Sequence, residues 1–235
     1  MSIDLHPDSP PWFRRALAVP FEDGTVEVGG VDVHFSSWGE AGRRGLIFVH
    51  GGGAHCHWWT HVAAQFAMDF RVLALDLSGH GDSGHRAEYS LEQWTDEVMA
   101  VAVAGGVQGP PVVVGPSMGG FVTIATAAMH GDALAGVVIC DSPVMEMDPE
   151  TRSYQLKQAF GQPRVYDSVD EALRRFRTVP EQPEYLDYVV DHVARRSLKQ
   201  VEGGWQWKFD RQIFEQFAGG MRGIAAPYLS LIHIS

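Results

Sequence analysis

The segment Gly115-Pro-Ser117-Met-Gly119 matches the pattern G-x-S-x-G and is the part of the sequence that most directly suggests chemistry. A serine in this pattern occupies a sharp turn between a strand and a helix, where its hydroxyl can act as a nucleophile. An apolar strand-like run ends at this motif and a helical pattern begins, as such a turn requires. Side chains at Gly115 and Gly119 are expected to clash with the neighbouring strand and helix. We predict Ser117 as a nucleophile; the alternative is a serine that caps the following helix.

Strand-like and helical patterns alternate around this motif. Apolar runs predict strands at 45–49, 71–77, 111–114 and 134–140, and helical spacing predicts helices at 58–66, 91–101 and 118–130. Ser90 and Gln93 form a capping box ahead of the second helix. A hairpin is expected at 25–37 across Gly29-Gly30. This order predicts an α/β fold with a mostly parallel, doubly wound sheet.

The segment 145–221 departs from that alternation, because the apolar strand runs stop. It reads as helices and loops, with a capping box of Ser168 and Glu171 and a helix opened by Pro183. We expect a helical cap inserted into the sheet domain. The chain then divides into a core at 1–144, the cap at 145–221 and the start of another core strand at 222–228.

The composition of the chain disfavours some classes of binding partner. The chain of 235 residues has 18 Lys and Arg against 29 Asp and Glu, a formal net charge of −11 that disfavours nucleic acid and anionic membranes. Its two cysteines, Cys56 and Cys140, fall in segments that read as buried and are too few for a disulfide scaffold. With no apolar stretch long enough to span a membrane and no signal-peptide pattern, we expect a cytoplasmic protein with a small-molecule substrate.

Three motifs occur in a fixed order: His50-Gly-Gly-Gly53, Asp76-Leu-Ser-Gly-His-Gly-Asp-Ser83, and Gly115 to Gly120, each after a predicted strand. Over roughly 26–228 the chain resembles the α/β-hydrolase superfamily, specifically its small cap-bearing esterase-like and lyase-like members. The resemblance implies an eight-stranded, mostly parallel sheet, a helical cap after the sixth strand, a Ser-His-acid triad and no cofactor.

The resemblance also assigns roles at the site. It implies that the backbone N–H groups of Met118 and Gly52 stabilise the oxyanion beside Ser117. A simple glycine turn is the alternative for the Gly51 to Gly53 segment. Asp141, after the sixth predicted strand, is a candidate triad acid; the alternative is an Asp that caps its loop.

Other motif residues are assigned mainly to binding or to scaffold. Gly53, Trp205 and Trp207 are predicted to contact substrate, with ordinary cap core as the alternative for the two tryptophans. The 76–83 segment, with His50 and His80, is expected to fix loops. The cluster of His55, His57 and His61 lacks the Glu of an H-E-x-x-H motif, and we expect no metal site there.

The resemblance places a triad histidine after the last strand, and the sequence departs from it there. Residues 229–235 resemble the translation of a sequencing-library adapter. We therefore expect the last strand, its helices and the triad histidine to be missing from this chain, and we do not assign His233 to the triad. Without a base, Ser117 is a poor nucleophile near neutral pH.

Taken together, the sequence predicts a serine hydrolase that attacks an ester or another carbonyl-type small molecule and forms an acyl-enzyme, with impaired activity in this chain. A dehalogenase is excluded, since its nucleophile is an Asp. A C–C hydrolase or lyase stays open, because those chemistries use the same turn and triad. A non-catalytic small-molecule-binding protein on the same fold is the alternative from another class.

Overall fold

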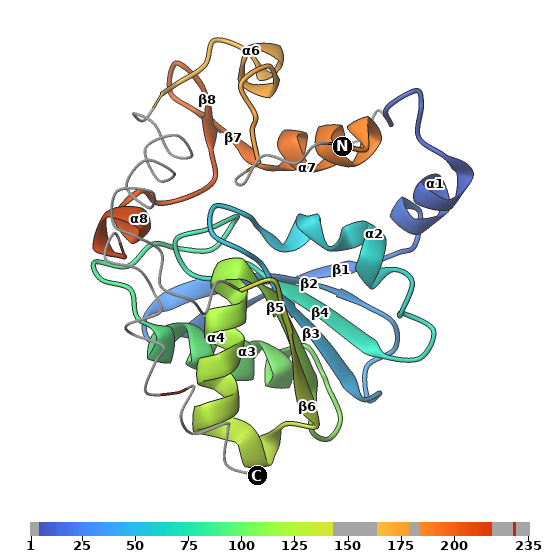
Figure 1. Cartoon of the computed structure of the whole chain (residues 1–235), viewed down its shortest axis with the longest axis vertical. Helices are drawn as coiled ribbons and strands as arrows, with labels where there is room; N and C mark the ends of the chain where they lie inside the picture. The colour runs from blue at the N-terminus through green and yellow to red at the C-terminus, as the bar shows by residue number, and fades with distance from the viewer. Residues whose placement is uncertain (1–4, 143–163, 179–183, 218–227, 229–235) are drawn as a thin grey trace.

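A six-stranded sheet is the centre of the fold. This computed structural model describes residues 5–142, 164–178, 184–217 and 228 (Figure 1). The strands are β1 (Glu22–Val28), β2 (Val31–Trp38), β3 (Gly45–Val49), β4 (Arg71–Leu75), β5 (Val112–Pro116) and β6 (Gly136–Cys140). They lie in the order β1-β2-β4-β3-β5-β6, with β4, β3, β5 and β6 parallel and the β1-β2 hairpin antiparallel. The predicted mostly parallel α/β sheet is confirmed.

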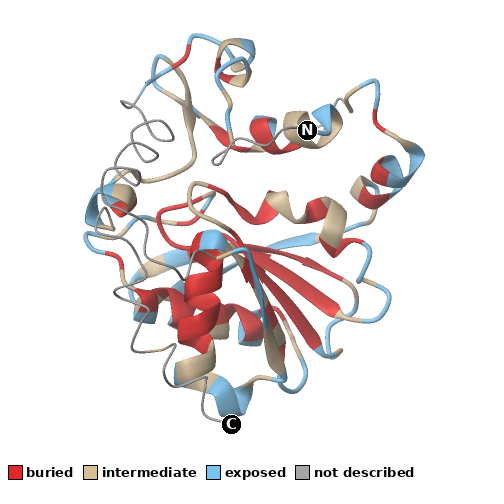
Figure 2. Cartoon of the chain, viewed as in Figure 1, coloured by how far each residue is buried: buried red, intermediate tan, exposed pale blue. Residues whose placement is uncertain are grey.

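Helices cover both faces of this sheet. On one face lie α3 (Leu91–Ala104) and α4 (Ser117–His130), which pack on Ile47 and Val49 of β3. On the other lie η1 (Cys56–Trp58) and α2 (Thr60–Ala63), which pack on Leu46 and Phe48. Adjacent β3 residues thus point to opposite cores, which explains why this strand is apolar throughout and buried (Figure 2). The helix η2 (Gly131–Ala133) links α4 to β6.

Two local details differ from the sequence expectation. The helix predicted at 58–66 is instead the 3₁₀ turn η1 followed by the single turn α2. Cys140 is exposed, whereas Cys56 is buried as predicted. The Cys140 prediction was wrong because β6 is the edge strand of the described sheet, where an apolar run is not covered on both faces.

The expected cap segment contains more than helices. Its described elements are α6 (Val169–Leu173), α7 (Asp187–Arg196), β7 (Leu198–Val201), β8 (Gly204–Trp207) and α8 (Gln212–Gln216). The antiparallel β7-β8 hairpin was not predicted, because its strands are only four residues long and β7, Leu-Lys-Gln-Val, has no polar–apolar alternation. Of the predicted capping box only the Ser168 half is present: its side chain accepts from the Glu171 N–H, whereas the Glu171 carboxylate accepts from the Asp167 N–H. The helix expected from Pro183 begins later, at Asp187.

Polar contacts fasten this segment over the carboxyl ends of the strands (Figure 1). Lys208 forms an ion pair of 2.7 Å with Asp82, and the Tyr89 hydroxyl donates to Asp210 at 2.7 Å. Among the described residues, no helix is long and apolar enough to cross a membrane.

Three buried histidines lie where α7 meets the η1 region. His55 Nε2 donates to the Ser197 hydroxyl at 2.9 Å, and Arg196 donates to His57 Nε2 at 3.3 Å. Burial lowers the pKa of His55 to about 4. Burial and the nearby Arg196 charge lower the pKa of His57 to about 2 and that of His192 to about 3. All three rings are therefore neutral at pH 7.

We predict that this arrangement makes the fold sensitive to mild acid. Below about pH 6.5 the unfolded chain binds protons that these rings exclude, so the free energy of unfolding falls as the pH falls. Each such histidine costs about 2 kcal/mol of stability at pH 5. The ring of His192 lies beside that of Phe13, so Phe can replace it. In His192→Phe, the decrease in the free energy of unfolding between about pH 7.5 and pH 5, measured by calorimetry, should be smaller by the contribution of one histidine.

His130→Phe is the control, because His130 ends α4 away from the α7 contact (Figure 1). The hydrogen bond to Asp76 raises the pKa of His34, so this histidine makes the folded state more stable as the pH falls. His34 is unchanged in both variants, so its contribution cancels when they are compared with wild type. Equal pH dependence of wild type and His192→Phe would contradict the prediction.

Candidate active site

Ser117 sits on a sharp turn between β5 and α4. Its φ of +49° lies in the left-handed region that residues other than glycine rarely occupy, and its side chain is exposed. A Cβ on Gly119 would overlap the carbonyl oxygen of His50, and one on Gly115 would overlap that of Gly119. The predicted need for glycine at both positions is confirmed. The capping position of α4 is Pro116, without a side-chain cap, so the alternative of Ser117 as a helix cap is wrong.

The glycine loop after β3 lies beside the start of α4. A Cβ added to Gly51 would lie 3.7 Å from the Ser117 Cβ, and one added to Gly52 would lie 3.8 Å from the Met118 Cβ. Gly53 has a φ of +69°, which favours glycine there. Met118 belongs to the first turn of α4, where backbone N–H groups have no partner within the helix. Two candidate oxyanion donors, Gly52 and Met118, are thus neighbours of Ser117.

Asp141 follows β6 directly beside this turn. Cys140 pairs with Pro116 across the β5-β6 ladder, and the Ser142 hydroxyl donates to the Ser117 carbonyl at 3.0 Å. Asp141 is exposed and has a φ of +46°, so the ends of β5 and β6 both carry a residue in the left-handed region. Asp141 therefore lies near the turn that carries Ser117, and no described histidine contacts its carboxylate.

His50 fixes the glycine loop. Its Nε2 accepts from the Leu77 N–H at 3.0 Å, so its Nδ1 carries the proton and donates to the Gly51 carbonyl at 2.7 Å. Both ring nitrogens are used, and burial lowers the pKa of the ring. His80 lies against it, with ring centroids 4.7 Å apart. These contacts support the loop-fixing role predicted for His50.

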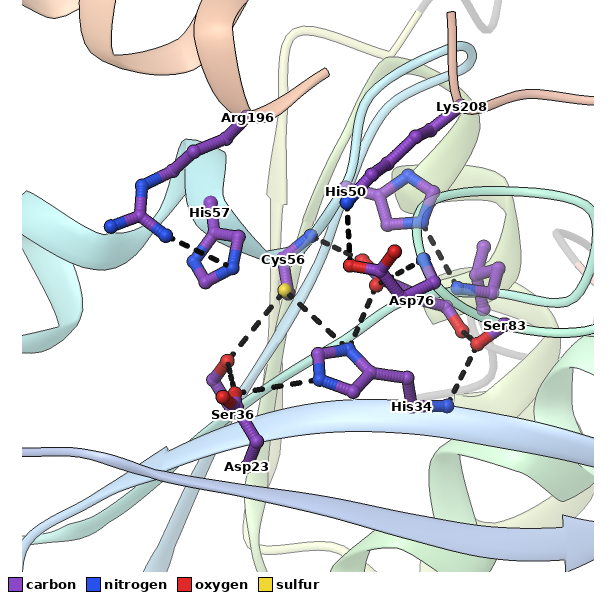
Figure 3. A network of polar contacts seen from close by, with 12 residues as sticks. Asp23, His34, Ser36, His50, Cys56, His57, Asp76, Ser83, Arg196 and Lys208 are labelled. Atoms are coloured by element: carbon purple, nitrogen blue, oxygen red, sulfur yellow. Dashed lines mark hydrogen bonds and ion pairs between the residues drawn. The ribbon is translucent and has the colours of Figure 1, made fainter. Parts of the chain in front are cut away.

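Asp76 holds the loop that follows β4. Its carboxylate accepts from the N–H groups of Cys56 and Asp82, at 2.6 and 2.9 Å, and bonds to His34 Nδ1 at 2.9 Å (Figure 3). Although burial alone would raise it, the pKa of Asp76 is lowered, with the His34 hydrogen bond the largest favourable contribution. The Ser83 hydroxyl donates back to the Asp76 carbonyl at 2.5 Å. These contacts support the scaffold role predicted for the 76–83 segment.

Among the described residues, one group of three potential metal ligands lies close enough together to bind an ion. It consists of His34, Cys56 and Asp76, whose ligand atoms lie within 4.8 Å of one another. Both Asp76 oxygens already accept backbone N–H groups. Burial raises the pKa of the Cys56 thiol, which keeps it protonated at neutral pH. The group is therefore best described as a hydrogen-bonded network. His55 and His57 of the predicted histidine cluster bond to Ser197 and Arg196.

An apolar cavity of about 460 Å³ opens beside the turn that carries Ser117. Gly51 and Pro116, the neighbours of Ser117, line one part of it. Its aromatic and aliphatic walls come from α1 (Pro11–Leu17), the η1-α2 region and the segment around α7. These wall residues include Trp12, Trp58, Trp59, Val62, Phe176, Tyr185, Val189 and Val193.

The tryptophans predicted to bind substrate lie elsewhere. Trp205 and Trp207 pack on a small cluster with Tyr166, Ala172 and Leu198, and neither is among the described residues that line the cavity. This placement fits the alternative of ordinary cap core. Sequence reasoning missed Trp12 and took Trp58 and Trp59 only as one helical face; their position just after the glycine loop was the available signal.

A base for Ser117 is not found in the described part of the chain. None of the histidines described there hydrogen-bonds to the Ser117 hydroxyl; His50 and His55 are engaged as given above. His233 and the residues predicted to begin another core strand, 222–227, lie outside the described residues.

Comparison with known proteins identifies the family. The family model for the alpha/beta hydrolase fold matches residues 46–226, so this chain belongs to that family. Among curated relatives, it is 28% identical to Esterase Rv0045c of Mycobacterium tuberculosis over 77% of this chain and 62% of that protein. It is 33% identical to the pimeloyl-[acyl-carrier protein] methyl ester esterase of Edwardsiella ictaluri over 44% of this chain and 38% of that protein.

Solved structures agree on the fold. The thioesterase domain from the curacin biosynthetic pathway superposes with a TM-score of 0.72 at 23% identity, covering 92% of this chain and 81% of that one. E-2-(acetamidomethylene)succinate hydrolase gives a TM-score of 0.77 at 18% identity, covering 91% and 78%. This chain spans between 38% and 62% of the length of the two curated relatives named above.

We predict that Gly119→Ala destabilises the chain by about 1–3 kcal/mol, because the added methyl group forces α4 away from the His50 carbonyl. Gly131→Ala is a matched control, since its Cβ would meet nothing within 4 Å, and it should change stability by less than about 0.5 kcal/mol. Urea unfolding measures both. Equal effects of the two variants would show that the fold does not require the close approach of α4 to the His50 carbonyl.

Proposed function

We propose that this protein is a carboxylic-ester hydrolase with Ser117 as its nucleophile. The observation that carries the proposal is the exposed Ser117 hydroxyl, held at a φ of +49° beside an apolar cavity of about 460 Å³. A left-handed serine is strained, and such strain is typical of functional sites. Relatives named as esterase and methyl ester esterase support hydrolysis of esters as the reaction class.

In the proposed mechanism, Ser117 Oγ attacks the ester carbonyl carbon and transfers its proton to a base. The carbonyl oxygen becomes an oxyanion that accepts hydrogen bonds from the N–H groups of Met118 and Gly52. The tetrahedral intermediate then expels the alcohol, which takes up the proton, and leaves an acyl group on Ser117. Water activated by the same base hydrolyses this acyl-enzyme.

The base in this scheme is a histidine outside the described residues, since none within them bonds to Ser117. Removal of a triad member leaves only the part of the catalysis that comes from the oxyanion donors and substrate binding. The rate of hydrolysis therefore depends on that histidine reaching Ser117 Oγ. The second candidate is a non-catalytic small-molecule-binding protein, for which the apolar cavity of about 460 Å³ would be the ligand site.

The charge of the protein restricts the substrate. Glu184 is the one carboxylate among the described residues that line the cavity, and no Lys or Arg lines it there. With a formal net charge of −11, the protein repels anionic ligands. An uncharged ester with an apolar acyl group fits best. Free Cys56 and Cys140 suit a reducing compartment, which supports the cytoplasm as its location.

Ser117→Ala tests the proposal. It should reduce hydrolysis of p-nitrophenyl butyrate by at least roughly 100-fold, because it removes the oxygen that forms the proposed acyl-enzyme. Ser168→Ala is the control, since Ser168 is also exposed but only caps α6. Stopped-flow absorbance of nitrophenolate measures both rates.

Three outcomes would contradict this proposal. Equal rates for Ser117→Ala and wild type would place the hydrolysis elsewhere. An absence of hydrolysis in wild type, with apolar ligands still bound, would favour the non-catalytic binding protein. A product formed by cleavage of a C–C bond in preference to an ester would favour the C–C hydrolase or lyase.

Asp141 is the candidate acid for the proposed triad, because it follows β6 next to the turn that carries Ser117. If it orients the histidine, Asp141→Asn should lower kcat/KM by at least roughly 100-fold with little change in stability. Asp132→Asn, an exposed carboxylate in η2, is the control. A loss below about threefold would show that Asp141 only shapes its loop.

A further inference from the structure

A helix that lies before the sheet in the chain, α1, contributes to the wall of the cavity. Trp12 of α1 is one of its lining residues, whereas Gly51 and Pro116 line the part beside Ser117. Figure 1 shows α1 next to α2 and α7, separated from the start of α4. A ligand whose reacting carbon lies at Ser117 therefore has the Trp12 side of the cavity available for its far end.

Aromatic contacts hold α1 in that position. Phe13 is buried, with its ring centroid 4.9 Å from that of Tyr188 in α7 and 5.5 Å from that of His61 in α2. Phe13 thus joins the core to the segment above it. Trp12 packs beside the same two rings, with centroids 6.2 Å from Tyr188 and 6.4 Å from His61.

Trp12 is also partly exposed, with 39% of its surface accessible. Its indole therefore both lines the cavity and reaches the surface of the protein. Phe13 supplies the buried anchor, so loss of the Trp12 ring removes the wall while leaving the Phe13 contacts of α1 in place.

We propose that Trp12 sets the length of the acyl group that this site accepts. The inference rests on the proposed function and names the substrate class as uncharged esters of straight-chain acyl groups that reach from Ser117 to the Trp12 ring. A longer chain meets the indole, whereas a shorter one leaves apolar surface of the cavity uncovered and loses binding energy.

Chain-length profiles test the proposal. The p-nitrophenyl esters of acetate, hexanoate, octanoate, decanoate and laurate are compared on wild type and on Trp12→Ala. The ratio of kcat/KM for laurate to that for hexanoate should rise roughly tenfold in Trp12→Ala, since the longer chain then passes into solvent. Trp12→Phe, which retains a ring, should shift the ratio less.

Phe66→Ala is the matched control, because Phe66 is 40% exposed and does not line the cavity. It should leave the ratio as in wild type. An unchanged ratio in Trp12→Ala, with both variants hydrolysing short esters, overturns the role of Trp12 and leaves the ester hydrolase proposal intact.

A binding measurement separates this inference from the proposed function. In the Ser117→Ala background, ω-bromo alcohols of increasing length are titrated while tryptophan fluorescence is recorded; Trp58 and Trp59 line the cavity and report a bromine nearby. Adding Trp12→Ala should shift the best-binding length upward. That shift supports the inference even where no ester is hydrolysed, and an identical length preference in both backgrounds overturns it.

Discussion

The close approach of α4 to the ends of β3 and β5 is the constraint on which the site depends. Two glycines permit it, because a methyl group at Gly115 or Gly119 would overlap backbone oxygens. That approach places Ser117 in the left-handed region at the start of a helix and brings the loop containing Gly52 beside Met118. The nucleophile and both proposed oxyanion donors are therefore positioned by backbone packing, with little dependence on side-chain conformations.

The loops around this turn are fixed by buried polar groups with paired partners. Asp76 accepts from two backbone N–H groups and His34, and His50 links Leu77 to Gly51 (Figure 3). Neutral His55 and His57 then connect the core to Ser197 and Arg196. Such networks stabilise a buried site only when their members are satisfied. The apolar cavity lies between the glycine loop and the segment around α7, where a ligand can bind.

Much of the core could be predicted from sequence, because strand and helix periodicity, the Ser90 capping box and the G-x-S-x-G turn are local signals. The β7-β8 hairpin could not, since its short strands pack through Trp205 and Trp207 against residues distant in the chain. The exposure of Cys140 depended on its place at the edge of the described part of the sheet. Trp12 joins the cavity through contacts with α2 and α7, which no spacing within α1 reveals.

The most direct test of the central claim is mass spectrometry of the folded chain after treatment with an octyl fluorophosphonate. The account predicts one adduct, located on the peptide that contains Ser117, with none after the chain is unfolded beforehand. An adduct on a different serine, or equal labelling of the folded and unfolded chain, would contradict the claim that the fold makes Ser117 a nucleophile.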